Sequence, residues 1–330
     1  MSSSIEDMSQ APHIALLGVG AVGQLICHQL SSVGSEILLL TRSKSGLQTL
    51  TYHPISNADT NVSAYTTISH QYHCQAIEAV TVEQLANIRL LIVTTKAYQV
   101  VELIKPLLAI LRADCHLVLL HNGMGPHLAL SAMLAQYPNI GLSLATTSQG
   151  ALRLSQWQVK HTGAGLTHLG HSFGKPMADN YRQLLLKAIP NSHWQDDIIS
   201  SLWQKLAINC AINPLTAIHQ CQNGALAAPQ HQDTIRALLL ELIPVAKAQG
   251  VELEFASLLE KVNQVISLTA QNYSSMYQDI AHHRPSEITQ INGYVSQSAQ
   301  QHGLQTPHHQ AMLNAIKSLE TANRLSALSR

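Results

Sequence analysis

The sequence predicts an α/β fold, with an N-terminal doubly wound parallel sheet followed by an all-α C-terminal domain. The first observation is the apolar run 14–17, which leads into a glycine-rich turn and an amphipathic segment, as a buried strand leads into a helix. The second is that helical periodicity extends from about residue 196 almost to the end of the chain. The third is the recurrence of apolar strand patterns at Glu36–Leu40, Arg89–Lys96, Leu117–Leu120 and Ile140–Ala145.

The glycine-rich turn has the spacing of a Rossmann-type dinucleotide site. Gly18 permits a tight turn, Gly20 lets the backbone approach a pyrophosphate, and Gly23 lets the helix pack closely on the strand. The positive N-terminus of that helix would then hold the phosphates. A chance glycine-rich loop is the alternative, but strand, glycines, helix and second strand follow in the required order. The expected cofactor-binding turn comprises Gly18, Val19, Gly20, Ala21, Val22 and Gly23.

The residues after the second strand indicate which dinucleotide binds. A site for NADH would place Asp or Glu here, to hold the ribose hydroxyls. This chain has Thr41-Arg42-Ser43-Lys44 instead. A guanidinium group binds phosphate through paired charged hydrogen bonds, so Arg42 favours the 2'-phosphate of NADPH. The alternative is that Arg42 and Lys44 lie on an ordinary solvated loop.

Length and charge define the class of protein. A chain of 330 residues accommodates two domains, and we expect a disordered leader at 1–12, an NADP-binding domain at 13–195 and a helical substrate and catalytic domain at 196–330. The 19 basic side chains balance the 19 acidic ones, which argues against a nucleic acid or a membrane surface as partner. The leader has no signal-peptide pattern, so we expect a cytoplasmic protein.

Cysteine and histidine give no indication of a metal site. The five cysteines form no CxxC pair, and the 19 histidines are scattered without the HExxH spacing. We therefore expect reduced, mostly buried thiols and no metal ion.

Polar residues follow the predicted strands at their carboxyl ends, where ligands gather in doubly wound sheets. Lys96 ends one strand, Asn122 follows the next, and the small polar segment Thr146–Ala151 follows the last. Asn122 could hydrogen-bond a cofactor or substrate, although an ordinary Asn-Gly turn has the same sequence. Two other segments are less regular: Tyr52–His73 fits short edge strands and loops, and Trp157–Gly170 fits an antiparallel edge.

The helical half carries polar residues at helical spacing. Lys205, Asn209 and Asn213 lie four residues apart in the predicted helix Ile198–Ile218, so they share one face. Such groups need partners if they are buried. The alternative is a lysine that reaches solvent beside two satisfied amides. Pro214 is expected to end or kink this helix just after Asn213.

Two later segments repeat this pattern. A helical stretch over Val262–His282 contains Asn272 and Ser275, three residues apart. Glu287 follows Pro285-Ser286 at the expected start of another helix. A glutamate at that place could simply be a favourable charge at a helix N-terminus.

Several of these motifs together resemble the ketopantoate reductase (2-dehydropantoate 2-reductase) family, over nearly everything from Ile14 to about Glu320. The most specific part of the resemblance is the block Lys205–Ala217. The motifs that carry it are the glycine turn, Thr95-Lys96-Ala97, His121-Asn122-Gly123-Met124-Gly125, the Lys205–Ala217 block, Ser274-Ser275-Met276-Tyr277-Gln278-Asp279 and Glu287-Ile288.

The resemblance implies an NADPH-dependent reduction of 2-dehydropantoate to pantoate, a step towards pantothenate and coenzyme A. It implies that Lys205 is the general acid and that Glu287 assists in substrate binding and catalysis. The positions implied for substrate are Asn122, Asn209, Asn213, Asn223 and Ser275. Those implied for cofactor are the glycine turn, Arg42, Lys96, Asn122 and Ala151.

The chemistry of the residues agrees with this mechanism. Hydride transfer to a ketone builds negative charge on its oxygen, which an ammonium group such as that of Lys205 can stabilise and protonate. We expect the site in the cleft between the domains, and either a monomer or a homodimer. Two other functions stay open: a related dehydrogenase for another 2-keto or 3-hydroxy acid, and a non-catalytic NADPH-binding sensor.

Overall fold

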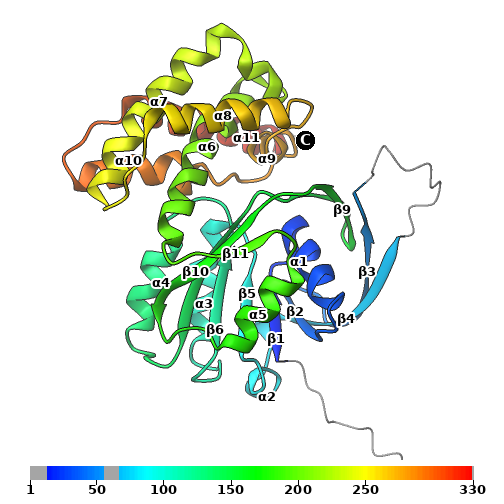
Figure 1. Ribbon diagram of the computed structural model, residues 1–330. Coiled ribbons are helices and arrows are strands. Elements are labelled where there is room, and N and C mark those ends of the chain that lie inside the picture. Colours follow the sequence, from blue (N-terminus) through cyan, green and yellow to red (C-terminus); the bar gives the residue numbers. More distant parts are fainter. Residues whose placement is uncertain (1–12, 56–66, 329–330) are drawn as a thin grey trace, which may run out of the picture. The chain divides into compact units, whose positions relative to one another are not determined.

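The computed structural model describes residues 13–55 and 67–328, so the leader expected at 1–12 lies outside the described residues. Contacts within the chain divide it into two compact units. The sheet unit comprises the described residues up to His121 together with Pro126–Ile198, and the helical unit comprises Asn122–Gly125 and the described residues from Ile199 onward. The predicted fold class, a doubly wound sheet followed by a helical region, is confirmed (Figure 1).

Six parallel strands form the centre of the sheet unit, in the order β7-β6-β5-β1-β2-β4. Strand β1 lies between β2 and β5, so the chain builds the sheet outward on both sides of it. All of these strands except β4 are buried along nearly their whole length, as is typical of strands that are covered on both faces of a sheet. Their bounds are β1 Ile14–Leu17, β2 Ile37–Thr41, β5 Leu90–Val93, β6 His116–Leu120 and β7 Gly141–Thr147.

The remaining strands extend the sheet to eleven. Beyond β4 it continues as β3-β9-β8, and beyond β7 as β10-β11. The bounds of β4 are Ile68–Ala76, and those of the five outer strands are β3 Gly46–His53, β8 Gly150–Ser155, β9 Gln158–Gly163, β10 Thr167–Gly174 and β11 Ser192–Trp194. The helices of the unit are α1 Ala21–Ser31, α2 Val82–Leu85, α3 Val100–Leu107, α4 Pro126–Leu134 and α5 Asp179–Ala188, with short 3-10 turns η1 Ile77–Ala79 and η2 Ala97–Gln99.

Two sequence expectations about this sheet hold only in part. Tyr52–His73 was expected to give short edge strands and loops; residues 56–66 of this segment lie outside the described residues. The strands at its two ends, β3 and β4, are eight and nine residues long and lie inside the sheet, not at its edge. Their apolar signal is weak because alternate residues face solvent, and in β4 only Tyr72 and Cys74 are buried. The antiparallel pairing expected over Trp157–Gly170 is present, since β9 pairs with β8 and β10 pairs with β7 in this way. The two strands do not form one edge, because β9 also pairs with β3 whereas β10 lies on the other side of the sheet.

The helical unit is built mainly from three long helices, α6, α7 and α11, and α8 packs against α7 (Figure 1). Its elements are α6 Ile198–His219, η3 Asn223–Ala227, α7 Pro229–Ala248, α8 Phe255–Leu268, α9 Ser275–Ala281, η4 Ile288–Gln290, α10 Asn292–Gln301 and α11 Pro307–Leu328.

Helix α6 runs through Pro214 and ends only at His219, so it does not stop after Asn213. A proline lacks the N–H that would bond the carbonyl four residues earlier, which here is that of Cys210. The side chain of Asn292 on α10 replaces the missing donor, with its Nδ2 atom 3.3 Å from the Cys210 oxygen. The same Nδ2 lies 3.2 Å from Nδ1 of the buried His309. The Cys210 carbonyl therefore keeps a hydrogen-bond partner where the helix passes Pro214.

The helix expected over Val262–His282 is interrupted. Helix α8 ends at Leu268 and α9 begins at Ser275, after Ser274, whose Oγ accepts a hydrogen bond from the backbone N–H of Tyr277. The connection between them receives η3, because the N–H of Asn223 donates to the carbonyl of Asn272 at 2.9 Å. The polar residues that interrupt the apolar pattern therefore serve the connection and its contacts.

Candidate active site

The glycine turn joins β1 to α1 in the sheet unit. Gly18 has a φ of 103°, a conformation that favours glycine, and its carbonyl accepts a hydrogen bond of 2.5 Å from Oγ1 of Thr94. A Cβ atom on Gly23 would lie 2.0 Å from the Gly18 carbonyl oxygen, so helix and turn pack too closely for a side chain. Gly20 differs, because nothing lies within 4 Å of its Cβ position. The N-terminus of α1 thus adjoins open space suited to an anion.

Three strand ends meet beside this turn. Leu17 of β1 is paired in register with Leu40 of β2 and Val93 of β5, so the segments that follow these three strands are neighbours. Arg42 follows β2 and is exposed, and Lys96 follows β5 and is partly buried. In a doubly wound sheet, the residues that bind a dinucleotide usually follow the carboxyl ends of adjacent strands in this way.

Local contacts also fix the surroundings of two other residues expected to bind cofactor, Arg42 and Ala151. The turn that carries Arg42 is closed by Thr41, whose Oγ1 accepts from the N–H of Lys44 at 3.0 Å. Ala151 lies in β8, which contacts α1, and it packs against the apolar core of the unit.

The segment Asn122–Gly125 belongs by its contacts to the helical unit, although it follows β6 of the sheet. The N–H of Met124 donates to the carbonyl of Gln290 at 2.8 Å. Gly123 has a φ of 77°, and a Cβ there would lie 2.5 Å from the same carbonyl oxygen. The amide of Asn122 donates to Oε2 of Glu287 at 3.4 Å, across 165 residues of sequence. Two residues expected to bind substrate are therefore neighbours.

Lys205 interacts with the same carboxylate. It lies on α6 and is partly buried, whereas Glu287 is only 5% exposed. Burial lowers the pKa of Lys205 from 10.5 to about 8, and the negative charge of Glu287 acts in the opposite direction. A lysine with this pKa is still mostly protonated at neutral pH but releases its proton more readily than an exposed one. Such a group is suited to general acid catalysis.

The other expected substrate residues lie on α6, η3 and α9. Asn209 is partly buried, Asn213 is buried, and Ser275 is exposed as the first residue of α9. The hydroxyls of Thr216 on α6 and Ser274 lie 2.7 Å apart, which ties the start of α9 to α6. Ser275 is thereby fixed relative to the face of α6 that carries Asn213.

Asn223 is buried and half satisfied. Its Nδ2 donates to Oγ1 of Thr269 at 2.8 Å, while its Oδ1 has no hydrogen-bond partner in the described part of the chain.

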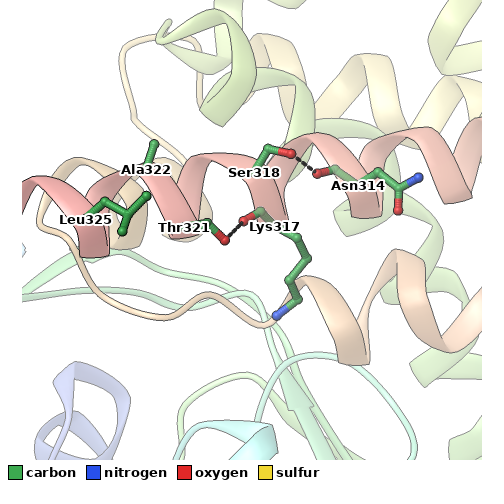
Figure 2. A pocket seen from close by; sticks show the side chains of 6 residues that line it. All are labelled: Asn314, Lys317, Ser318, Thr321, Ala322 and Leu325. Atoms are coloured by element: carbon green, nitrogen blue, oxygen red, sulfur yellow. Dashed lines mark hydrogen bonds between the residues drawn. The ribbon is translucent and has the colours of Figure 1, made fainter.

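Figure 2 shows a separate groove along α11, which contains none of the expected site residues and is lined by side chains of this one helix: Asn314, Lys317, Ser318, Thr321, Ala322 and Leu325.

Within residues 13–55 and 67–328, no group of three or more His, Cys, Asp or Glu side chains is arranged to hold a metal ion. None of the helices described has both the length and the apolar character needed to cross a membrane.

Known proteins match most of this chain. Models of "Ketopantoate reductase PanE/ApbA" and of its C-terminal domain match residues 14–173 and 197–320. A Vibrio cholerae protein named 2-dehydropantoate 2-reductase is 39% identical over 313 residues, which cover 93% of this chain and 98% of that protein. The chain belongs to the ketopantoate reductase family. It is accordingly an oxidoreductase, as the resemblance of its motifs implied.

A second relative agrees with this membership, and solved structures share the fold. An Escherichia coli O157:H7 protein, also named 2-dehydropantoate 2-reductase, is 33% identical over 93% of this chain and 95% of its own. The structure of a probable 2-dehydropantoate 2-reductase from Bacillus subtilis has a TM-score of 0.74 at 24% identity, covering 93% of this chain and 99% of that one. D-mandelate dehydrogenase with NADH and anilino(oxo)acetate has a TM-score of 0.82 at 22% identity, covering 94% and 99%. These two structures share the fold.

One feature of the site escaped the sequence reasoning. Asn122 follows strand β6, as expected, but no sequence pattern indicated that its loop hydrogen-bonds Gln290 and Glu287 of the helical unit. The only local signal was the pair of glycines, Gly123 and Gly125, both of which have positive φ.

Proposed function

We propose that this protein catalyses the NADPH-dependent reduction of 2-dehydropantoate to pantoate, with Lys205 as the general acid. The observation that carries the proposal is the cluster of Lys205, Glu287 and Asn122, in which a lysine with a lowered pKa interacts with a buried carboxylate beside an amide. The names and identities of the V. cholerae and E. coli relatives support the same substrate.

The sheet unit has residues that fit the cofactor. Open space at Gly20 suits the pyrophosphate at the N-terminus of α1. The exposed Arg42, which stands where an NADH site has an acidic residue, suits a 2'-phosphate. We assign Gly18, Val19, Ala21, Val22, Gly23, Lys96, Asn122 and Ala151 to the same site. NADPH, when bound, supplies the hydride for the keto carbon.

The helical unit supplies the acid and the substrate contacts. As the ketone is reduced, negative charge grows on its oxygen, and the Lys205 ammonium stabilises that charge and transfers a proton from Nζ to the oxygen. Glu287 keeps Lys205 protonated by raising its pKa and helps to bind substrate. Asn122, Asn209, Asn213, Asn223 and Ser275 are proposed to hold the carboxylate and hydroxyl groups, which fixes the carbonyl for reaction.

We place this reaction in pantothenate and coenzyme A biosynthesis, in the cytoplasm. The domains are proposed at 13–195 for NADP binding and 196–330 for substrate and catalysis. The resulting site would serve a monomer or a homodimer equally well.

A panel of 2-keto acids tests this function in steady state, with NADPH and NADH compared for each. We expect kcat/KM to be highest for ketopantoate with NADPH. A higher value for another 2-keto acid would instead identify a related dehydrogenase. Tight NADPH binding without oxidation in single-turnover mixing with every acid would identify a sensor.

A further inference from the structure

A second buried carboxylate lies directly behind the turn that carries Glu287. Oε1 of Glu320, on α11, accepts two hydrogen bonds of 2.7 Å from Ser286, one from its backbone N–H and one from its hydroxyl. Ser286 and Glu320 are 4% and 6% exposed, so both bonds are shielded from water. Hydrogen bonds to a charged acceptor are about twice as strong as neutral ones. Residue 286 is therefore held firmly.

Through Ser286, the Glu320 carboxylate constrains both neighbours of Glu287. Ser286 precedes Glu287 directly, and its Oγ also accepts a bond of 3.3 Å from the N–H of Ile288, which follows Glu287. The backbone oxygen of Glu287 in turn accepts from the N–H of Gln290 at 3.0 Å. Glu287 therefore lies in a turn whose geometry depends on Glu320.

The second oxygen of Glu320 has its own partner. Nζ of Lys317 lies 3.0 Å from Oε2, and the lysine side chain is 49% exposed. Figure 2 shows this side chain extending from α11. Burial by itself raises the pKa of Glu320, but the hydrogen bonds from Ser286 and Lys317 outweigh it, so the pKa lies below its usual value. Glu320 is thus ionised at neutral pH, and each of its two oxygens accepts hydrogen bonds.

We propose that Glu320 is a positioning residue for Glu287, which it holds in place through Ser286; this inference rests on the role given to Glu287 above. The same turn anchors the Asn122 loop, because Glu287 accepts from Asn122 and Gln290 accepts from Met124. Loss of Glu320 should therefore disturb substrate binding and turnover together. It should leave the glycine turn and Arg42 of the sheet unit in place, so NADPH affinity should change far less than turnover.

Three variants test the proposal in the full-length protein. Glu320→Ala should lower kcat/KM for ketopantoate by about tenfold or more, because misplaced groups lose catalytic efficiency steeply. NADPH affinity should stay within about twofold of wild type, a change of less than about 0.5 kcal/mol. Glu320→Gln should recover most of the activity, since its carbonyl oxygen can still accept both bonds from Ser286. Ser286→Ala should lower kcat/KM for ketopantoate by about two- to tenfold, which corresponds to the loss of one hydrogen bond. This variant tests the proposal even if Glu320→Ala does not fold.

Glu241→Ala is the matched control. Glu241 is another largely buried carboxylate that binds α11, accepting from the backbone N–H groups of His308 and His309 at 3.0 and 3.2 Å, but it does not contact Ser286. It should lower the melting temperature while kcat/KM stays within about twofold, because its contacts are structural. Equal kinetic losses in Glu241→Ala and Glu320→Ala would overturn the positioning role.

Glu287→Gln separates this inference from the proposed function. When Glu320→Ala is added to Glu287→Gln, it should lower kcat/KM much less than it does in the wild-type protein, because the group that Glu320 positions has already been altered. If Glu287→Gln lowers turnover and both Glu320→Ala and Ser286→Ala leave it unchanged, the inference fails and the proposed function stands. If Glu287→Gln itself has wild-type kinetics, the role of Glu287 fails, and the positioning role with it.

Discussion

The sheet unit and the helical unit hold their functional groups by different physical means. In the sheet unit, close backbone packing fixes the turn, since Gly18 and Gly23 leave no room for side chains. In the helical unit, contacts between distant side chains bring Asn122, Lys205 and Glu287 together, and the carboxylate at their centre is buried. The difference teaches that variants should divide into two groups. Those in the sheet unit should change cofactor affinity, and those in the helical unit should change turnover.

The largest effect should come from Lys205→Ala. General acid catalysis contributes about 10² to 10⁴-fold, so turnover should fall by about 10²-fold or more while NADPH binds normally. Lys205→Arg should not restore it, because arginine keeps the charge but does not release a proton. Stopped-flow oxidation of NADPH measures the loss. Lys261→Ala, a lysine of α8 that donates to Gln204 at 2.6 Å, is the control and should retain activity. Near wild-type turnover in Lys205→Ala would contradict the claim that the helical unit supplies the general acid.

The next effect belongs to the sheet unit. Arg42→Ala should weaken NADPH binding by about ten- to a hundredfold, the cost of a lost charged hydrogen bond of about 1.5 to 3 kcal/mol. NADH, which lacks the 2'-phosphate, serves as the internal control and should bind as it does to wild type. Fluorescence titration with both cofactors decides the matter. Equal weakening of the two would mean that Arg42 does not contact the phosphate.

Two glycines of the same turn sharpen the comparison. Gly20→Ala places its Cβ in open space, so the melting temperature should not change, but NADPH should bind about tenfold more weakly if the pyrophosphate approaches there. Gly23→Ala places its Cβ against the Gly18 carbonyl, and such overpacking costs about 1 to 3 kcal/mol of unfolding free energy. Thermal unfolding and NADPH titration of both variants test this contrast. Similar melting temperatures for the two would contradict it.

The smallest effect should come from two adjacent serines of the helical unit. Ser275→Ala removes an exposed hydroxyl, so KM for ketopantoate should rise about two- to tenfold with an unchanged melting temperature. Ser274→Ala removes the cap of α9 and should instead cost about 1 kcal/mol of stability. Steady-state kinetics and thermal melts on both proteins separate binding from structure. A stability loss in Ser275→Ala with normal KM would remove Ser275 from the substrate site.

Much of the fold could be predicted because its signals are local. Fully apolar runs such as Leu90–Val93 and a glycine turn specify buried strands and the first helix without reference to the rest of the chain. The long pair β3 and β4 could not be recognised, because only alternate residues of β4 are buried and its partners are distant. The continuation of helix α6 beyond Pro214 could not be predicted for a similar reason. The donor that replaces the missing N–H of Pro214 is the side chain of Asn292, which lies far along the chain.

The candidate site shows the same limit. The spacing of Lys205, Asn209 and Asn213 placed three polar groups on one helix face, but gave no information about what they face. Their grouping with Glu287 came from a family resemblance, and the Asn122 loop was assigned to the sheet. The buried Glu320 had only an indirect signal, its position one turn after the fully buried Ile316 on α11. Such tertiary partners are not encoded in local periodicity.

The pH dependence of kcat/KM tests most directly the claim that Lys205 donates the proton while Glu287 maintains its charge. With ketopantoate and NADPH, the wild-type value should fall above about pH 8, because the pKa of Lys205 is about 8 and only the protonated lysine is an acid. In Glu287→Gln this fall should begin at lower pH, since the charge that raises the lysine pKa is gone. A kcat/KM that stays constant to about pH 10, or an identical fall in both proteins, would contradict the claim.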